Sequence, residues 1–335
     1  MYFNAAVLLK KNKIEILELD LPILKNGQSL IKILYSSICH THVQEIDGLR
    51  GKDFFLPHCL GHEAVGIVVD KHKSVKKVKN NDHVCLSWIS SKGINSGGMH
   101  YLTKNGLKVN AGPVHTFSEY AVISENKIYK IKKQSKMKEK VLLGCALPTA
   151  YNVLEDLNLE KVKSICIVGC GGLGISSILA AKDYNIKHIT AVDYNLSKLK
   201  IAKKIGAHEL FDNLSKIDKI KKNFDVIIEC TGNINILEKC ADFTKKFGGR
   251  IVVVGNYPKG KILKIDPWHI IQGKTFLGAW NDQKTFDNKF KKFEKKIKNK
   301  KLDYFFGNKI YNLNNINNAI KDFKNGNMIR PLLKL

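Results

Sequence analysis

Arginine is nearly absent from this chain, although its 335 residues carry a formal net charge of +26 at pH 7. It occurs only at Arg50, Arg250 and Arg330, so lysine supplies almost all of the positive charge. Such a charge first suggests a polyanionic partner, but surfaces that bind phosphates usually depend on the bidentate arginine fork. Because the lysines are scattered together with many asparagines, we interpret them as a solvated surface. No specific nucleic-acid partner is expected, and a polyanion-binding protein is a distant alternative.

Cysteine is too dilute for a disulfide framework, since there are only eight and several lie in apolar runs that predict core strands. This usage fits a reducing compartment. The segment Met1 to Lys13 has one short apolar run and no small-residue cleavage site, so no signal peptide is predicted and a cytoplasmic location is expected. The composition excludes collagen-like and coiled-coil proteins and allows a sizeable core.

A membrane-spanning segment is also not predicted. The stretch Ser164 to Ala181 is uncharged over 18 residues, which is close to the length of a transmembrane helix. It contains four glycines within six positions and three serines. A strand, a glycine turn and a helix explain it better, so no membrane partner is expected.

The chain has two regions with different patterns. From Ala5 to about Ile131 the apolar segments are short, rich in Val and Ile and broken by turns such as Asn26-Gly27, which predicts a barrel or rolled sheet. From about Ser164 to Ala279 apolar strands alternate with Lys-rich helices, which indicates an α/β domain with a doubly wound parallel sheet. The strands expected there are Ile165–Val168, Ile189–Val192, Phe224–Glu229, Arg250–Gly255 and Thr275–Ala279, and later helices are expected at Phe286–Ile297 and near Ile316–Phe323.

A glycine loop follows the first of these strands. The strand Ile165–Val168 runs into Gly169-Cys170-Gly171-Gly172-Leu173-Gly174 and then into a helical segment, Ile175 to Lys182. In a dinucleotide-binding fold Gly169 makes the tight turn, Gly171 lets the backbone approach a pyrophosphate, and Gly174 lets helix and strand pack closely. The phosphate rests on the helix N-terminus. By itself the motif can also be an ordinary glycine turn.

Asp193 ends the next strand about 20 residues after the loop, where an acid binds the ribose 2′-hydroxyl of NAD. It favours NAD over NADP, because it would repel a 2′-phosphate and the following Tyr194-Asn195 supplies no arginine. Lys198, one turn onward, could donate to the same ribose. The alternatives are that Asp193 caps the next helix and that Lys198 is a surface lysine.

Three motifs upstream carry metal-binding residue types: Cys39-His40-Thr41-His42, Gly61-His62-Glu63 and Gly144-Cys145. Thiolate sulfur and imidazole nitrogen suit Zn²⁺, and a catalytic zinc has three protein ligands and one open position. The spacing does not establish a site, because the motifs are far apart and no CxxC or HExxH motif occurs. Taken singly, Cys39 or Cys145 is better explained as a buried core thiol than as a metal ligand.

These motifs occur in one order with Thr149, the GCGGLG loop, Asp193 and Ile329-Arg330. In that order the chain resembles the zinc-dependent alcohol dehydrogenases of the medium-chain dehydrogenase/reductase family over nearly its whole length. The resemblance implies a discontinuous GroES-like, β-rich catalytic domain, residues 1–146 and 280–335. It also implies a Rossmann NAD-binding domain at 147–279 and a homodimer or homotetramer.

The resemblance also implies roles for individual residues. Cys39, His62 and Cys145 would hold one catalytic zinc, with Glu63 behind it as a candidate exchange ligand. Thr41 would take the alcohol proton. Thr149 and Leu173 would contact the nicotinamide, and His40 and Arg330 would hold the pyrophosphate of NAD(H).

Three features of the sequence depart from the family pattern. His42 stands where an aspartate commonly orients the zinc-bound histidine, so it either alters the basicity of that ligand or itself approaches the metal. Gln44 stands where many members end the proton relay in a histidine. No cysteine lies between Cys85 and Cys145, so no structural zinc is predicted, and Ser90 to Pro113 is interpreted as a glycine-rich loop.

The expected activity is hydride transfer between NAD(H) and an alcohol, polyol or sugar-type hydroxyl, or the matching carbonyl. Zinc would act as the Lewis acid, because it lowers the pKa of a bound alcohol. The alternative from the same superfamily is a zinc-free quinone or enone reductase, which would have no reason to keep the three ligand positions. Candidate residues of the substrate pocket are Phe54, Phe55, Trp88, Met99, His115 and Trp280.

Overall fold

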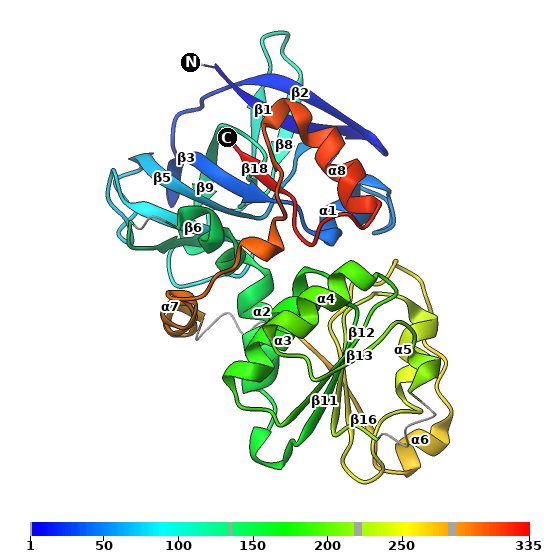
Figure 1. Ribbon diagram of the computed structural model, residues 1–335. Helices are drawn as coiled ribbons and strands as arrows, with labels where there is room; N and C mark the ends of the chain where they lie inside the picture. The colour runs from blue at the N-terminus through cyan, green and yellow to red at the C-terminus, as the bar shows by residue number, and fades with distance from the viewer. Residues whose placement is uncertain (1, 134–135, 218–222, 281–285) are drawn as a thin grey trace. The chain divides into compact units, whose positions relative to one another are not determined.

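The computed structural model (Figure 1) describes residues 2–133, 136–217, 223–280 and 286–335. The chain divides into two compact units, Met1–Pro148 with Asp282–Leu335, and Thr149–Asn281. The first unit is built mainly of strands and contains both ends of the chain, and the second is an α/β unit.

The first unit contains two sheets, with strand orders β2-β1-β4-β8-β7 and β10-β6-β5-β3-β18-β17. The strand β9 also pairs with β3, so β3 contacts neighbours in several directions, as the expected rolled sheet requires. The strands are β1 (Tyr2–Lys10), β2 (Lys13–Asp20), β3 (Gln28–Ser37), β4 (His58–Cys59), β5 (Glu63–Lys71), β6 (His83–Ser87), β7 (Met99–Leu102), β8 (Lys108–Ala111), β9 (Tyr120–Ser124), β10 (Ile128–Lys130), β17 (Ile310–Tyr311) and β18 (Leu332–Lys334).

The strand β1 shows how the sequence builds two cores at once. Its residues alternate between the two faces of the sheet, as the period of a strand dictates. Ala6 and Leu8 belong to one hydrophobic cluster, whereas Phe3, Ala5 and Val7 belong to another. Residues 5–8 are therefore all buried, which explains why this segment is continuously apolar.

The C-terminal segment returns to the first unit, where β18 pairs antiparallel with β3. Helix α7 (Phe286–Ile297) buries Phe286, Phe290, Phe293 and Ile297, a spacing that places them on one helix face, and its lysines remain outside. Helix α8 (Ile316–Lys324) contributes Ile316, Ala319 and Ile320 to the cluster of Ala6 and Leu8. The remaining helices of the unit are α1 (His40–Ile46) and the 3-10 helices η1 (Glu125–Lys127), η2 (Met137–Gly144), η6 (Asp303–Phe305) and η7 (Leu313–Asn315).

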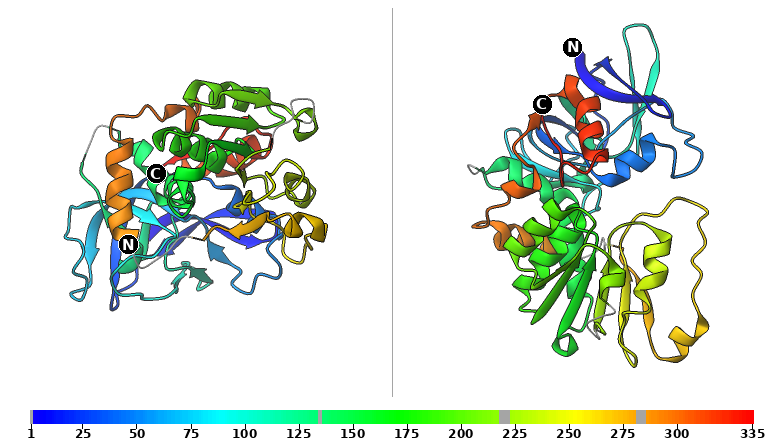
Figure 2. Two further views of the ribbon diagram at one scale, coloured as in Figure 1. Left: turned by 90° about the horizontal axis from the view of Figure 1, so that it is seen from below. Right: turned by 45° about the vertical axis from the view of Figure 1, so that its right-hand side comes forward.

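The second unit has a six-stranded sheet of order β13-β12-β11-β14-β15-β16 in which all neighbours are parallel. Helices α3 and α4 cover one face and α5 covers the other (Figure 2), so the sheet is doubly wound. The elements are β11 (Ser164–Val168), β12 (His188–Val192), β13 (Glu209–Phe211), β14 (Val226–Glu229), β15 (Arg250–Val253), β16 (Thr275–Gly278), α3 (Gly172–Asp183), α4 (Leu196–Ile205), α5 (Ile234–Cys240), α6 (Pro267–Ile271), η3 (Leu159–Lys161) and η4 (Leu214–Lys216). Helix α2 (Ala146–Glu155) crosses the boundary between the two units.

Three features differ from the sequence-based expectation. The edge strand β13 was not expected, because its three residues are too few to show a pattern. Helix α3 begins at Gly172, which is earlier than the expected Ile175. The segment Ser90 to Pro113 is not simply a loop, since β7 and β8 form an antiparallel hairpin within it. Among the described residues, no helix is sufficiently long and apolar to cross a membrane.

Candidate metal centre and dinucleotide site

Three separate elements of the first unit bring Cys39, His62 and Cys145 together. Cys39 is the N-cap of α1, His62 immediately precedes β5, and Cys145 immediately follows η2. Their ligand atoms all lie within 4.8 Å of one another, and all three residues are half-buried. The structure thus assembles the three residues that the sequence analysis selected as zinc ligands.

The donor atoms of this cluster suit zinc. The Nε2 atom of His62 is buried and has no hydrogen-bond partner among the described residues, so its lone pair is available to a metal. The pKa of the Cys39 thiol lies well below its ordinary value, because the Cys145 thiol donates a hydrogen bond to it and the Arg330 cation favours the thiolate. The pKa of Cys145 is correspondingly raised by that hydrogen bond and by burial. Two sulfurs and one imidazole nitrogen form the soft donor set of a catalytic zinc.

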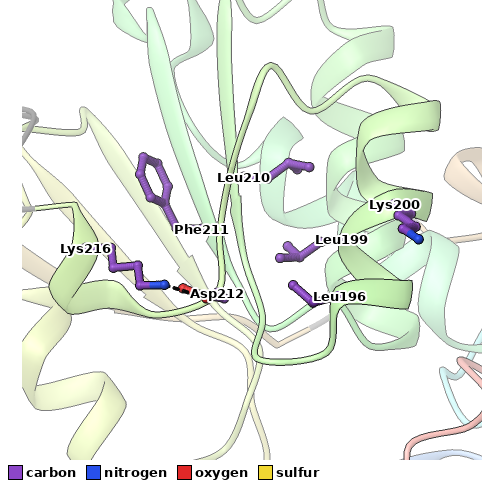
Figure 3. Close-up of a pocket in the computed structure, with 7 residues that line it drawn as sticks. All are labelled: Leu196, Leu199, Lys200, Leu210, Phe211, Asp212 and Lys216. Carbon is purple, nitrogen blue, oxygen red and sulfur yellow. Dashed lines mark hydrogen bonds and ion pairs between the residues drawn. The ribbon is translucent and has the colours of Figure 1, made fainter.

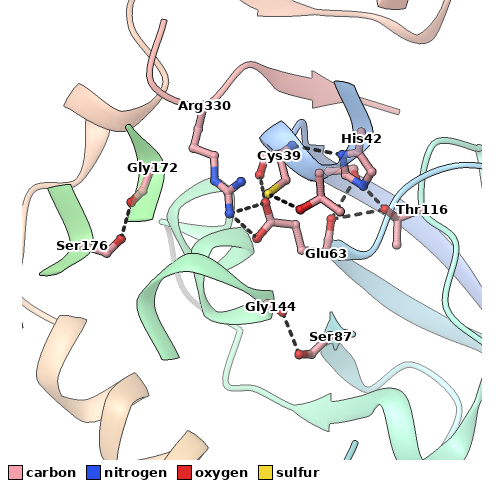
Figure 4. Close-up of polar contacts among 12 residues, drawn as sticks. Cys39, His42, Glu63, Ser87, Thr116, Gly144, Gly172, Ser176 and Arg330 are labelled. Carbon is pink, nitrogen blue, oxygen red and sulfur yellow. Dashed lines mark hydrogen bonds and ion pairs between the residues drawn. The ribbon is translucent and has the colours of Figure 1, made fainter. Parts of the chain in front are cut away.

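Behind the cluster lies a buried ion pair between Glu63 and Arg330 (Figure 4). Glu63 is fully buried, and Arg330 Nη2 lies 3.0 Å from its Oε1 and 3.3 Å from its Oε2. The hydroxyl of Ser37 also donates to Oε1. Burial raises the pKa of Glu63, and Arg330 opposes that shift by stabilising the carboxylate. The role of Ser37 was not predicted, because a serine in a strand carries no sequence signal for such a contact.

His42 lies directly against the predicted ligand His62. Their ring centroids are 4.2 Å apart, and His42 is 1% exposed. Its Nδ1 accepts a hydrogen bond of 3.0 Å from the backbone N–H of Cys39, so the proton of the neutral ring is on Nε2. Burial and the neighbouring His62 lower the pKa of His42 well below its ordinary value. A neutral group therefore occupies the position where the family commonly has a carboxylate.

The other predicted residues of α1 lie close to the cluster or at its edge. Thr41 Oγ1 is 3.6 Å from Cys39 Sγ, which places its hydroxyl beside the metal ligands. His40 is exposed, with its ring edge-to-face against Phe323 at 6.0 Å. Gln44 is buried on the same helix.

The glycine loop in the second unit has the geometry of a phosphate cradle. Gly169 has a φ of +93°, and a Cβ on Gly174 would lie 1.8 Å from the carbonyl oxygen of Gly169, so neither position accepts another residue without strain. Gly171, the N-cap of α3, has no atom within 4 Å of the position of a Cβ. That open space lies at the first turn of α3, where backbone N–H groups are free to bind an anion. These residues fit a dinucleotide pyrophosphate.

Asp193 is held against the glycine loop. Its Oδ2 accepts 2.7 Å from the backbone N–H of Cys170, and its Oδ1 accepts 2.8 Å from that of Asn195. The cap of α4 is Asn195, whose side chain accepts from Ser197 and Lys198. Asp193 therefore does not cap that helix, and the helix-cap alternative for it is wrong. Lys198 is half-buried in the first turn of α4.

Two cavities lie within the second unit. One, of about 180 Å³, includes Thr149 of α2 and Gly278, Ala279 and Trp280, which end β16 and follow it. The other, of about 370 Å³, lies between α4 and β13 (Figure 3), where Leu196, Leu199 and Leu210 face one another and Lys216 pairs with Asp212. None of the residues predicted for the cofactor lines this second cavity.

His115, a candidate residue of the substrate pocket, lies in the core and lines neither of these two cavities. It is fully buried, with its Nε2 2.8 Å from the hydroxyl of Tyr101 and its Nδ1 3.0 Å from the carbonyl of Gly112. Phe54, Phe55 and Trp280 are exposed, whereas Trp88 and Met99 are half-buried. Sequence alone could not separate these cases, because the burial of an aromatic or apolar residue depends on what the fold packs against it.

Comparison with known proteins agrees with this geometry. The family profile described as an alcohol dehydrogenase GroES-like domain matches residues 25–133, and the profile described as a zinc-binding dehydrogenase matches residues 172–299. An S-(hydroxymethyl)glutathione dehydrogenase from Photobacterium damsela subsp. piscicida is 28% identical over 79% of this chain and 81% of its own.

Solved structures resemble the whole chain. Benzyl alcohol dehydrogenase from Acinetobacter calcoaceticus has a TM-score of 0.84 and 26% identity, covering 100% of this chain and 99% of that one. An alcohol dehydrogenase zinc-binding domain protein from Burkholderia ambifaria has a TM-score of 0.88 at 22% identity, with coverage of 100% and 99%. The two matching profiles, the paired GroES-like and Rossmann units and the named relatives lead to one assignment: the chain belongs to the zinc-dependent alcohol dehydrogenases of the medium-chain dehydrogenase/reductase family and is an oxidoreductase that acts on CH–OH groups.

Proposed function

We propose that this enzyme transfers a hydride between NAD(H) and an alcohol, polyol or sugar-type hydroxyl, or the corresponding carbonyl. The observation that carries the proposal is the convergence of Cys39, His62 and Cys145, whose ligand atoms lie within 4.8 Å of one another. Residues from three distant parts of the sequence have no packing reason to place two thiols around an unpartnered imidazole nitrogen. We assign them one catalytic zinc and no structural zinc of the four-cysteine kind.

Zinc bound there would act as a Lewis acid that stabilises the alkoxide of the substrate. The residues around it supply its charge and geometry. Arg330 favours the ionised form of Glu63, whose carboxyl group lies behind the ligands as a candidate exchange ligand. His42 is neutral and stands where the family commonly has an aspartate. It therefore does not reduce the positive charge of the metal site as an aspartate would.

Proton transfer is assigned to Thr41, whose hydroxyl lies 3.6 Å from Cys39 Sγ. Gln44 cannot titrate, so the proton must leave by another route. His42 is 1% exposed and its Nδ1 is already bonded to the Cys39 backbone, which argues against it as the exit. We assign the exit to the exposed His40 or directly to water.

NAD(H), when bound, would accept or supply the hydride at its nicotinamide ring. The pyrophosphate would lie over Gly171, Gly172 and Leu173, with His40 and Arg330 as its cationic partners. Asp193 would accept from the ribose 2′-hydroxyl, aided by Lys198, and its negative charge selects against NADP. Thr149, which lines the cavity of about 180 Å³, would contact the nicotinamide together with Leu173.

The enzyme is expected to form a homodimer or a homotetramer. The strand β16 is an edge of the parallel sheet, and α6 before it exposes Trp268, Ile270 and Ile271. Burying such an edge and its apolar neighbours against a second copy would stabilise both. The eight free cysteines support a reducing compartment, and we place the enzyme in the cytoplasm.

The proposal is tested by measuring zinc content and NADH binding on protein purified without chelator, followed by a screen of alcohols, polyols and sugar derivatives. Zinc that is lost on Cys39→Ser, with NADH still bound, supports the assignment. Cofactor binding without zinc would contradict the metal site and favour a zinc-free reductase.

A further inference from the structure

A second group of metal-binding side chains lies in the first unit, apart from the predicted zinc ligands. Glu45 is in the last turn of α1, Asp53 is in the following loop, and His58 begins β4. One ligand atom from each lies within 4.8 Å of the other two. Loop residues 47–57 thus connect two ligand-bearing elements and carry the third ligand themselves.

The orientation of His58 requires a positive charge beside its Nε2. Its Nδ1 lies 3.1 Å from the carbonyl oxygen of Cys59, which can only accept, so Nδ1 carries a hydrogen. Its Nε2 faces carboxylate oxygens of Asp53 at 2.9 Å and Glu45 at 3.8 Å, which when ionised also only accept. A neutral imidazole has one N–H, so either a second proton or a cation must lie between Nε2 and the two carboxylates.

The charge of the group favours a divalent cation. The side chain of His58 is 9% exposed, whereas those of Glu45 and Asp53 are 27% and 24% exposed. In the described part of the chain, no lysine or arginine forms an ion pair with either carboxylate. A doubly protonated His58 would leave the group with one net negative charge, whereas a divalent ion with a neutral imidazole balances both carboxylates.

The surroundings of the ligands are also those of a metal site. A ligating histidine usually donates its other N–H to a backbone carbonyl, as His58 does to Cys59. The second oxygen of Asp53 accepts 2.9 Å from the N–H of Phe55, which fixes the carboxylate. The 2.9 Å between His58 Nε2 and Asp53 Oδ2 is a hydrogen-bond distance, so these two side chains would move slightly apart to admit an ion with bonds of about 2.1 Å.

We propose that Glu45, Asp53 and His58 form a second site for a divalent cation of the Zn²⁺ class, with water completing its coordination. The site links the end of α1, the loop and β4, and therefore braces the same helix whose N-cap, Cys39, is a predicted ligand of the catalytic zinc. Two carboxylates and one imidazole hold zinc less specifically than thiolates do, so this ion exchanges more readily than the catalytic one.

The test compares zinc content of the full-length protein after dialysis against micromolar free Zn²⁺ and removal of unbound metal. The wild type is expected to retain about two zinc ions per chain, and His58→Gln about one. Loss of a ligand should weaken this site more than loss of an outer partner does, that is by more than about 100-fold. His100→Gln, an exposed histidine on β7, is the matched control and keeps about two.

Three results separate this site from the proposed function, on which it does not depend. If Cys39→Ser and His58→Gln each lose about one of two ions, both sites are supported. If the wild type holds about one ion, lost in Cys39→Ser and kept in His58→Gln, the second site is wrong. If one ion is lost in His58→Gln and kept in Cys39→Ser, the second site stands and the catalytic zinc does not.

Because His58 is buried, its variant could fail to fold. Glu45→Gln and Asp53→Asn change more exposed members of the group and preserve side-chain size. Either one should also reduce the zinc content by about one ion per chain. Cobalt gives an independent readout, since the first site would show thiolate-to-metal charge transfer and the second would not. Failure of a second cobalt equivalent to bind to the wild type would overturn the proposal.

Discussion

The glycine loop and the metal centre are built in opposite ways. The loop is continuous in sequence, and its geometry follows from one strand, one helix and the glycines between them. The candidate metal centre is discontinuous, because Cys39 is an N-cap, His62 precedes a strand and Cys145 follows a 3-10 helix. A motif that is continuous in the sequence can therefore be interpreted from the sequence alone. A site whose residues lie far apart in the sequence can be interpreted only when the fold that brings them together is known.

The largest expected effect is on the candidate metal centre, whose residues lie far apart in the sequence. Cys145→Ser replaces a thiolate ligand by a hydroxyl, which binds zinc poorly, so the catalytic zinc is lost and kcat falls by about 1000-fold or more. The affinity for NADH should change by less than about threefold, because the glycine loop forms without the metal. Elemental analysis, steady-state kinetics and NADH fluorescence measure the three quantities.

The control for that variant is Cys59→Ser, which removes a buried thiol of the same unit whose pKa burial raises to about 12. It should keep its zinc. If Cys145→Ser lost both zinc and affinity for NADH, the metal site and the glycine loop would not form independently of each other.

The second prediction concerns a substitution in the glycine loop. Gly174→Ala places a Cβ 1.8 Å from the Gly169 carbonyl oxygen, so it should destabilise the second unit by about 3 kcal/mol and abolish tight NADH binding. Zinc content should not change. Chemical denaturation and NADH titration measure the two effects.

Gly171→Ala is the matched variant, because no atom lies within 4 Å of the position of its Cβ. It should leave the free energy of unfolding within about 1 kcal/mol of the wild type and still weaken NADH binding, since the methyl group would occupy the pyrophosphate position. Equal loss of stability in the two glycine variants would contradict this account of the loop.

A third prediction contrasts two histidines of the first unit. His62 has an unpartnered nitrogen, whereas both nitrogens of His115 are satisfied and burial lowers the pKa of His115 to about 4. The unfolded chain, with a pKa near 6.5, binds the proton first as the pH falls. The contribution of His115 to stability is therefore complete above about pH 6.5 and is lost towards pH 4, up to about 3 kcal/mol.

Urea denaturation at several pH values between 4 and 7 tests this dependence. The variant His115→Gln should be less stable than the wild type at pH 7 and should show a shallower loss of stability on acidification. Parallel pH profiles for the two proteins would show that His115 does not titrate in this way.

The smallest expected effect concerns cofactor choice. Asp193→Asn removes the negative charge that favours NAD, so kcat/KM with NAD should fall by about 10- to 100-fold and the preference over NADP should shrink. The readout is the ratio of kcat/KM with NAD to kcat/KM with NADP, because general destabilisation of the enzyme lowers both values equally. Asn195→Asp, two residues away at the helix cap, should preserve the ratio; a similar shift there would mean that Asp193 is not the discriminating group.

Much of the fold was predictable from the sequence because the patterns are local. Helix α7 has the expected bounds, since four apolar residues at helical spacing interrupt a lysine-rich segment. All five expected strands begin and end within two residues of the observed limits, and all five lie in the parallel sheet. The edge strand β13 and the hairpin of β7 and β8 were missed, because short strands are held by their partners and not by their own periodicity.

Sequence alone therefore determined the strand, glycine turn and helix around Gly169–Gly174 and the residue types suited to zinc. Only the tertiary structure decided which residues meet. It brought His62 beside His42, buried the Glu63–Arg330 pair, made Asn195 rather than Asp193 the cap of α4, and placed His115 in the core. It also joined Glu45, Asp53 and His58, which no motif connects. The reason is physical: hydrogen bonds and coordination depend on distances of a few ångströms, and for residues far apart in the chain those distances are fixed by packing.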